Sequence, residues 1–435
     1  MTSLYAAAAA SGGDPLFKNG IGSLTDPSVL LIVLLKVIVT FAVLLVAVLF
    51  MVWFERKVIS DMQNRIGPDR AGGKFGSLQS LADGIKLFFK EDLLPERADK
   101  RLFRLAPYLA LVPAFLSFAI VPLGGTVHLF GHETRLQLAD PPVGILWLLV
   151  MSSISVYGIM LAGWSSGSKY PLLGSVRASA QMVSYEAALG LSIVTVVLAT
   201  GALETSAIVA QQSLPFADNL PSWLHSWNIA KLAIVPFVIF VIAATAEINR
   251  PPFDLVEAES ELVGGFHTEY SGIRFAMFFL AEFMNTVTMS AIIVTLFLGG
   301  GDGPTFGFLP AWLASLMWFI VKLGVFLYAY VWVRGTLPRL RYDQLMDLGW
   351  KVLIPISLAW LLVIAALRIK VSYGLFTMAG MAVAGGLLYS SMLVGRSLRE
   401  DDDSSDDYGA LNNPLAYAEV YRLDDDDQPT EKAPI

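Results

Sequence analysis

The sequence predicts an all-α polytopic membrane protein, a bundle of about nine transmembrane helices, and three observations carry that prediction. The chain of 435 residues is 55% hydrophobic and only 15% charged, whereas soluble domains average about 25% charged residues. Apolar runs of about 18 or more residues recur, and each is long enough to cross the hydrocarbon core as a helix. The alternating segments of about ten residues that a membrane β-barrel needs are missing, and no strands are evident.

The predicted spans follow the apolar runs in order. They cover residues 28–54, 102–122, 143–163, 179–200, 229–247, 274–298, 310–333, 349–367 and 375–394. The first run has no basic region ahead of it and is too long for a signal peptide, so we expect it to remain as an anchor. In the first long connection, Leu78, Leu81, Ile85 and Phe88 recur at helical spacing. That pattern predicts an amphipathic helix lying in the membrane interface.

Composition divides the chain into four parts. These are an external N-terminal segment (1–27), a transmembrane core (28–367), an extra C-terminal helix (368–395) and an acidic tail (396–435). From Glu400 onward the chain has twelve Asp and Glu against two Lys and Arg, a net charge of −10, which leaves about +3 for the rest. The tail has too little apolar content to fold alone. It is either a solvated appendage or a docking strip for a basic partner surface.

The distribution of Lys and Arg predicts the orientation of the chain in its membrane. Eleven of them lie in the connection 55–104, whereas the connections 201–228 and 299–309 contain none. Because connections rich in Lys and Arg stay on the cytoplasmic side of a membrane, we expect an external N-terminus and a cytoplasmic tail. Arg368 and Lys370 break the pattern, so the topology of the last two helices stays open.

Missing residue types exclude several chemistries. The chain has no cysteine, so it holds no iron–sulfur cluster, thiolate metal site or disulfide. Its four histidines all fall in predicted loops, which disfavours a haem ligated between helices: His128, His132, His225 and His267. Nothing indicates nucleotide or nucleic-acid binding. We therefore expect no bound cofactor, and electrons for any redox reaction would arrive from another subunit.

An acidic connection between the fifth and sixth spans is the most informative segment. Residues 247–269 hold six carboxylates and one arginine, Arg250. Pro251 and Pro252 are expected to end the fifth helix, and Asp254 with Glu257 has the form of a capping box that starts a short helix. The carboxylates are Glu247, Asp254, Glu257, Glu259, Glu261 and Glu269.

The spacing of these carboxylates favours proton exchange. Asp254, Glu257 and Glu261 would share one helix face, while Glu259 falls within the apolar stripe. Carboxylates three and four residues apart repel, which raises some pKa values and couples their titrations. The segment is either a proton relay or a polar loop solvated by water, and we favour the relay because ionisable groups beside a bilayer usually mark an ion path.

Further charges lie in the spans themselves. Glu186 and Glu282 fall inside predicted helices, and Glu55 and Glu247 at helix ends, all on the predicted cytoplasmic side. This one-sidedness favours a half-channel entered from inside over a uniform pore. Lys36 is expected to reach the outer surface, whereas Lys322 lies nearer mid-span and the sequence indicates no partner for it.

Several motifs together resemble a known family. They are Glu55-Arg-Lys, Arg65-x-Gly-Pro, Asp83-x-x-Lys86-Leu, Arg177-x-x-x-Gln181-Met-x-x-Tyr185-Glu186 and the connection 247–269. In this order they resemble the family of the H subunit of bacterial NADH-quinone oxidoreductase (respiratory complex I), which is similar to mitochondrial core subunit 1. The resemblance covers about residues 28–367, and the ninth span and the tail depart from it.

The resemblance implies eight transmembrane helices, the membrane part of a quinone chamber and an acidic channel that couples quinone reduction to proton pumping. Quinone would be the substrate, and FMN and iron–sulfur clusters would lie in partner subunits. Those partners would be the peripheral-arm subunits at the quinone site and the small and antiporter-like membrane subunits. The chamber and its mouth would involve Glu55, Arg56, Arg65, Asp83, Arg177 and Arg250. The proton path would involve Glu186, Glu247, Asp254, Glu257, Glu259, Glu261, Glu269 and Glu282.

Two other functions stay open at this point. A membrane subunit of an energy-converting hydrogenase would share part of the acidic connection but use no quinone, and the intact mouth segment (55–91) counts against it. A proton-coupled transporter would be expected to show inverted repeats with interrupted helices, and the sequence has no such repeat. The sequence therefore favours a membrane subunit of a proton-translocating NADH:quinone oxidoreductase.

Overall fold

The computed structural model describes residues 14–17, 26–73, 75–214, 227–232, 234–254, 263–304, 309–370, 373–374 and 377–381. Within this part of the chain, seven helices are long and apolar enough to cross a membrane, which confirms the all-α polytopic fold. The chain divides into a unit of residues Met1–Ala365 and a second unit, Ala366–Ile435. Except where the second unit is named, the features below belong to the first unit.

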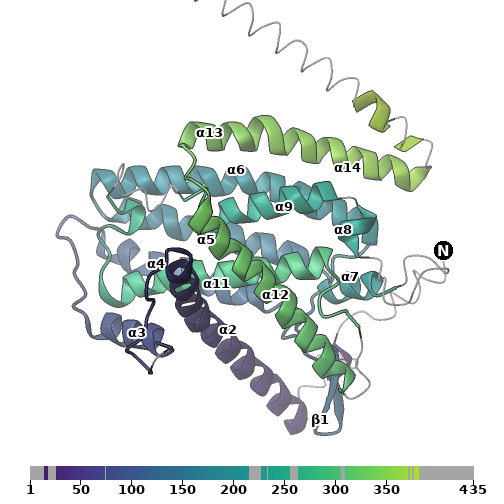
Figure 1. Cartoon of the computed structure of the whole chain (residues 1–435), viewed down its shortest axis with the longest axis horizontal. Helices are drawn as coiled ribbons and strands as arrows, with labels where there is room; N and C mark the ends of the chain where they lie inside the picture. Colours follow the sequence, from purple (N-terminus) through teal and green to yellow (C-terminus); the bar gives the residue numbers. More distant parts are fainter. Residues whose placement is uncertain are drawn as a thin grey trace, which may run out of the picture. The chain divides into compact units, whose positions relative to one another are not determined.

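The helices occupy the first eight predicted spans (Figure 1). The long ones are α2 (Pro27–Met62), α4 (Lys100–Phe118), α5 (Gly144–Ser165), α6 (Lys169–Thr200), α11 (Gly272–Phe297) and α12 (Ala311–Thr336). The eighth span comprises α13 (Tyr342–Asp347), a π-helical segment η4 (Leu348–Leu353) and α14 (Ile354–Ile369). The fifth is split into α8 (Asn228–Lys231) and α9 (Ile234–Glu247). In the second unit, residues 377–381 of the predicted ninth span are helical, and the rest of that span lies outside the described residues.

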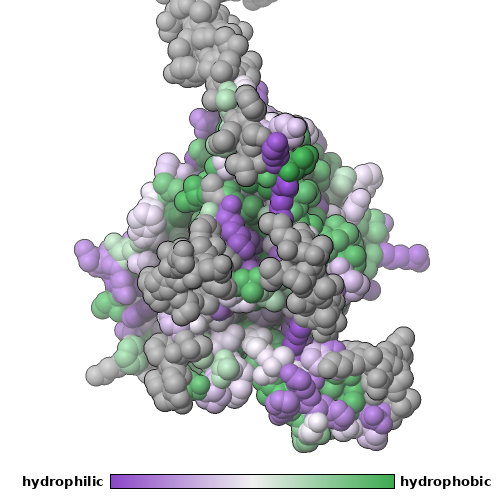
Figure 2. Space-filling view, turned by 90° about the vertical axis from the view of Figure 1, so that its right-hand side faces the viewer, coloured by the Kyte–Doolittle hydropathy of each residue, from purple (hydrophilic) through white to green (hydrophobic). Residues whose placement is uncertain are grey.

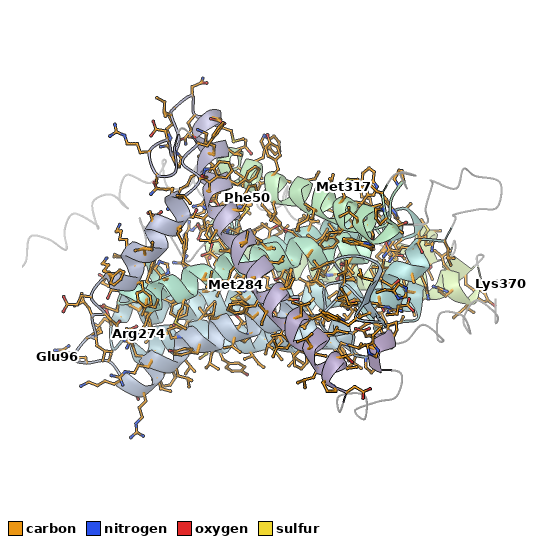
Figure 3. The ribbon with its side chains drawn as sticks, turned by 90° about the horizontal axis from the view of Figure 1, so that it is seen from below. Phe50, Glu96, Arg274, Met284, Met317 and Lys370 are labelled. Carbon is orange, nitrogen blue, oxygen red and sulfur yellow. The ribbon has the colours of Figure 1, made fainter. Side chains whose placement is uncertain are left out.

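Helix α11 forms the centre of the bundle. In its most apolar window 72% of the residues are buried, against 17% for α2. Helix α4 contacts α11 and packs against α5, and helix α9 contacts α11 and packs against α6. Helices α2 and α12 contact α11 and each other. In Figure 3, α2 with Phe50 crosses in front of α11 with Met284. The apolar side chains that α2 leaves exposed are those that lipid would cover.

Local sequence signals set the helix ends. Pro27 occupies the start of α2 after Asp26, and the Asp99 carboxylate accepts hydrogen bonds from the first backbone amides of α4, at Arg101 and Leu102. These are the residue types that favour helix starts. Helix α6 ends at Gly201, whose φ of 73° suits glycine.

Short elements complete the unit. They are η1 (Pro15–Phe17), α3 (Gln79–Phe89), α7 (Thr205–Gln212) and η3 (Gly265–His267). Helix α3 confirms the amphipathic helix, and it exposes Leu81, Ile85 and Phe88. Figure 2 faces the end of the bundle near α7 and α8, where hydrophilic side chains lie among hydrophobic ones. At this end Arg135, Asp140 and Ser206 form a hydrogen-bonded group.

The expectation that the chain has no strands is wrong in one place. Strands β1 (Thr126–Leu129) and β2 (His132–Arg135) form an antiparallel hairpin, with Leu129 opposite His132. The two turn residues, Phe130 and Gly131, have φ values of 50° and 83°, the backbone signs of a two-residue hairpin turn. The strands are too short for an alternating pattern to predict them. His128 and His132 consequently lie on strands rather than in loops, and His225 lies outside the described residues.

Lys36 and Lys322, the two lysines singled out from the sequence, have identifiable contacts. Lys36 pairs with Asp14. The Nζ atom of Lys322 donates to the carbonyl oxygens of Leu298, Gly300 and Asp302 at 2.7, 3.0 and 2.5 Å, and it lies 4.4 Å from the ring centre of Trp227. Lys322 therefore caps the C-terminal end of α11 rather than pairing with a carboxylate of the acidic path.

Close contact between α5 and α6 depends on Gly163. A Cβ atom there would lie 2.1 Å from the Ser175 Oγ and 2.4 Å from the Pro171 carbonyl oxygen. We expect Gly163→Ala to destabilise the protein by about 1–3 kcal/mol, because the backbone carbonyl cannot move away cheaply. The matched control is Gly190→Ala in α6, which meets nothing within 4 Å and should be neutral or stabilising. Thermal denaturation of the purified proteins compares the two variants, and equal midpoints would contradict this packing argument.

Candidate functional site

Four charged side chains from separate segments meet between α2, α11 and α12. The Arg250 Nη1 atom lies 3.1 Å from the Glu55 Oε2, and its Nε atom lies 3.1 Å from the Glu282 Oε1. Arg334, from the last turn of α12, pairs with the other Glu55 oxygen. We call Arg334, Glu55, Arg250 and Glu282 the charge chain. Its two carboxylates and two guanidinium groups balance in charge, and this matters most for Glu55 and Arg250, whose side chains are only 6% exposed.

Arg250 is held at the centre of the charge chain by the turn that follows α9. Asn249 has a φ of 52°, and the Gln181 side-chain amide donates to the carbonyl oxygens of Ala246 and Phe253 at 2.7 and 2.8 Å. These bonds fix both sides of the turn. The Arg250 guanidinium also lies 4.2 Å from the centre of the Phe283 ring, a favourable cation–π contact.

A cavity of about 560 Å³ opens beside the charge chain. Its charged lining consists of Glu55, Arg56, Arg65, Arg250, Glu282 and Arg334. Its apolar lining includes Ile59, Phe279 and Phe283. A volume of this size with a few convergent polar groups is typical of a small-molecule site.

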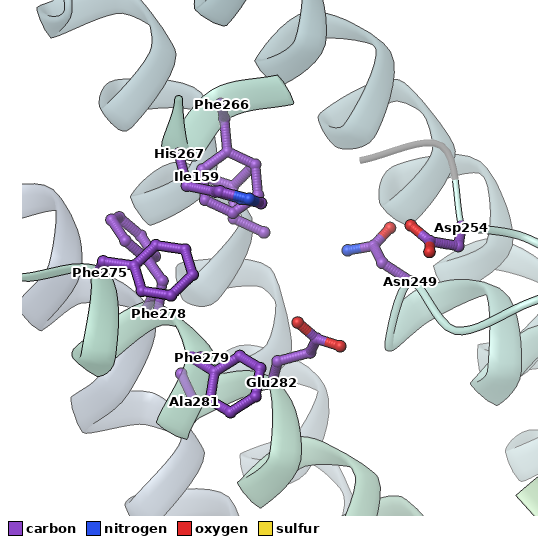
Figure 4. A pocket seen from close by; sticks show the side chains of 11 residues that line it. Ile159, Asn249, Asp254, Phe266, His267, Phe275, Phe278, Phe279, Ala281 and Glu282 are labelled. Carbon is purple, nitrogen blue, oxygen red and sulfur yellow. The ribbon is translucent and has the colours of Figure 1, made fainter. Parts of the chain in front are cut away.

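A second, smaller cavity also has Glu282 in its lining, and Figure 4 shows the side chains around it. It measures about 50 Å³ and its polar lining is Asn249, Asp254, His267 and Glu282. Four phenylalanine rings, Phe266, Phe275, Phe278 and Phe279, form the apolar wall. Glu282 and Phe279 border both cavities, so a proton on Glu282 could pass to either side.

Two residues of the smaller cavity interact electrostatically. Burial lowers the pKa of His267, and the nearby Asp254 carboxylate opposes that change. A neutral imidazole both donates and accepts a proton. Asp254 is itself 3.2 Å from Arg339.

Glu247 and Glu186 form a second carboxylate pair, deeper among α5, α6 and α9. The Ser152 hydroxyl of α5 donates to Glu247, and the neighbouring Ser153 hydroxyl donates to Glu186. The two carboxylates also interact electrostatically. Two adjacent serines of α5 therefore each bind one carboxylate, Glu247 at the end of α9 and Glu186 in α6.

The remaining residues predicted from the sequence are spread more widely. Asp83, on α3, pairs with Arg56 at the rim of the larger cavity. Arg177 lies 5.2 Å from the ring centre of Tyr342 and lines neither cavity. Glu269 is partly buried and also lines neither. Glu257, Glu259 and Glu261, with the short helix expected from Asp254, lie outside the described residues.

Sequence reasoning missed several members of the site. Arg334, Ser152, Ser153 and Asn249 were not singled out, and His267 was named only among the histidines in predicted loops. For the serines a usable signal existed, because two adjacent hydroxyls inside an apolar span are candidates for hydrogen bonds between helices. Nothing local in the sequence pairs Arg334 with Glu55.

Three relatives that this chain resembles are each named as the H subunit of NADH-quinone oxidoreductase. That of Frankia alni is 55% identical over 343 residues, which cover 78% of this chain and 73% of the relative. That of Streptomyces avermitilis is 50% identical over 346 residues, with the same coverage of both chains. That of Cutibacterium acnes is 47% identical over 394 residues, 88% of each chain.

Fold and site together define a multi-pass membrane protein whose helices enclose paired carboxylates and guanidinium groups beside a large cavity. A sequence family described as NADH dehydrogenase matches residues 35–365. The chain belongs to the family of the H subunit of NADH-quinone oxidoreductase.

Proposed function

We propose that this chain is a membrane subunit of a proton-translocating NADH:quinone oxidoreductase and that the larger cavity is the membrane part of its quinone chamber. The observation that carries the proposal is the position of the charge chain, which forms one wall of the 560 Å³ cavity. Keeping ion pairs beside a cavity costs free energy, because the charged side chains lose part of their hydration. A redox substrate that takes up protons explains that arrangement.

The chemistry of a quinone suits this lining. Its carbonyl oxygens accept hydrogen bonds, which Arg65 and Arg250 can donate, while Ile59, Phe279 and Phe283 contact an apolar ring. An isoprenoid tail requires an apolar route to the lipid. The exposed faces of α2 and α3, which contact each other, offer such a route.

Proton coupling follows from charge balance. Reduction of a quinone to a quinol takes two electrons, supplied by iron–sulfur clusters and FMN of partner subunits, and two protons. A proton taken from the charge chain leaves an excess negative charge there. That charge changes the protonation of the neighbouring carboxylates, because their titrations are coupled. We infer that the change passes from Glu282 through Asp254 and Glu269 to Glu257, Glu259 and Glu261, and through Glu247 and Glu186 to antiporter-like subunits.

Assembly and orientation complete the proposal. The peripheral-arm subunits at the quinone site would dock over the connections 55–101 and 247–269, the first of which carries Arg56 and Asp83, and over the first turns of α6, where Arg177 lies. The N-terminus would face outward and the acidic tail the bacterial cytoplasm, as the distribution of Lys and Arg indicates. The core 28–367 would carry the function, with the helix 368–395 and the tail 396–435 as additions.

Photolabelling of the intact complex tests the chamber. A photoreactive quinone should attach to residues 52–68 of this chain, since α2 and the segment after it line the cavity. Excess short-chain quinone should suppress that labelling, while the hairpin 126–135 serves as the unlabelled control. Absence of suppressible labelling would favour a hydrogenase-type subunit. Purification without flavin or iron–sulfur subunits would favour a transporter.

A further inference from the structure

The smaller cavity brings three titratable side chains to one space. Among its described lining residues these are Glu282 of α11, Asp254 after α9 and His267 of η3. Figure 4 shows the polar ends of all three around a common space, together with the Asn249 amide. Glu282 and Asp254 already belong to the proton path proposed above, whereas His267 has no role in it.

Each of the two carboxylates is held by its own arginine. The Glu282 Oε1 atom lies 3.1 Å from the Arg250 Nε, and the Asp254 Oδ2 atom lies 3.2 Å from the Arg339 Nη2. These ion pairs restrain both carboxylates, so a proton has to cross the cavity on another carrier. That carrier is either water alone or His267, the third titratable group of the described lining.

The His267 ring is held in place by two aromatic neighbours. Its centre lies 5.1 Å from that of the Phe266 ring, with the planes at 89°, and 5.4 Å from that of the Phe275 ring, with the planes at 67°. Such edge-to-face contacts stabilise one orientation of a ring. Because burial lowers the pKa of His267, the imidazole is neutral at rest, with one nitrogen that donates and one that accepts. The Asp254 carboxylate supports the protonated form while a proton passes.

We propose that His267 carries protons across the smaller cavity between Glu282 and Asp254, with water completing the hydrogen bonds. The cavity of about 50 Å³ has room for a few water molecules, at about 10–15 Å³ each. A proton from the Glu282 carboxyl group passes through water to a ring nitrogen, so an O–H bond breaks as an N–H bond forms. The imidazolium then releases a proton through water to the Asp254 carboxylate. No electrons change hands in either transfer.

This inference rests on the proposed function, and two variants of the intact complex test it. A ring-fluorinated histidine at position 267 keeps the size and packing of the ring but makes its nitrogen far less basic. His267→Phe keeps an aromatic ring against the same neighbours and has no nitrogen. We expect each to lower the proton-pumping rate at least about tenfold, since a positioned proton carrier contributes about 10²–10⁴-fold. The same fluorinated histidine at His128, on the exposed side of β1, is the matched control and should pump normally.

The outcomes separate the histidine from the rest of the proposed function. Normal pumping by either variant at position 267 would overturn the histidine carrier, because packing, hydrogen bonding or water alone would then be enough. If Glu282→Gln loses pumping in that case, the proposed function stands. If Glu282→Gln pumps normally as well, both are wrong. A density map of the wild-type complex with no water in contact with the His267 ring would also overturn the carrier.

Discussion

Arg250→Met is expected to abolish quinone reduction and to lower the amount of assembled complex. The substitution leaves the Glu55 and Glu282 carboxylates without the guanidinium group that now lies 3.1 Å from each. Removing one partner of a buried ion pair costs about 3–5 kcal/mol, because the other charge stays buried. Glu55 is only 6% exposed and would keep Arg334 alone as its partner, so the charge chain would be left with one excess negative charge.

A graded series distinguishes charge from geometry at this position. Arg250→Lys keeps the charge but cannot reach both carboxylates with a rigid planar group, so we expect stable complex with reduced activity. Adding Glu55→Gln to Arg250→Met should recover assembly in part, because it removes an uncompensated charge, without recovering quinone reduction.

The control is an exposed pair of the same chemistry. Arg341 and Asp343 are 77% and 73% exposed, and such pairs contribute about 0–1 kcal/mol. Arg341→Gln should therefore leave both assembly and activity near the wild-type values. Normal quinone reduction in Arg250→Met would contradict the role we assign to the charge chain.

The sequence predicts the helices of this protein well because a bilayer imposes a simple rule. A span needs enough apolar residues to cross the hydrocarbon core, and α2 and α11 satisfy that rule without reference to any neighbour. The rule does not predict how a span is divided. Helix α9 is a 14-residue helix preceded by the separate α8, and the eighth span passes through a π-helical segment.

The charge chain is less predictable because it depends on how distant segments align. Glu55 lies 195 residues from Arg250 and 279 from Arg334. Their meeting is fixed by the packing of α2, α11 and α12, which periodicity within one helix does not reveal. Individual residues could still be identified. An ionisable group within or beside an apolar span is costly, and that argument alone indicated Glu55, Glu186, Glu247 and Glu282 as well as Arg250.

The second large effect is expected from Glu247→Gln, which should lower proton pumping at least about tenfold, because a positioned proton carrier contributes about 10²–10⁴-fold. Glutamine preserves the shape and still accepts from Ser152, but it cannot take up and release a proton. Pumping by the complex in vesicles, measured with NADH and quinone, gives the rate.

Coupling between the two acids supplies a sharper test of the same path. Glu186 and Glu247 interact electrostatically and are joined by adjacent serines. If they act in one path, the double change Glu186→Gln with Glu247→Gln should cost little more than either single change. Glu133→Gln, on the exposed side of β2, is the control and should pump normally. Additive losses, or unchanged pumping in Glu247→Gln, would mean that protons reach the neighbouring subunits by a route that avoids this pair.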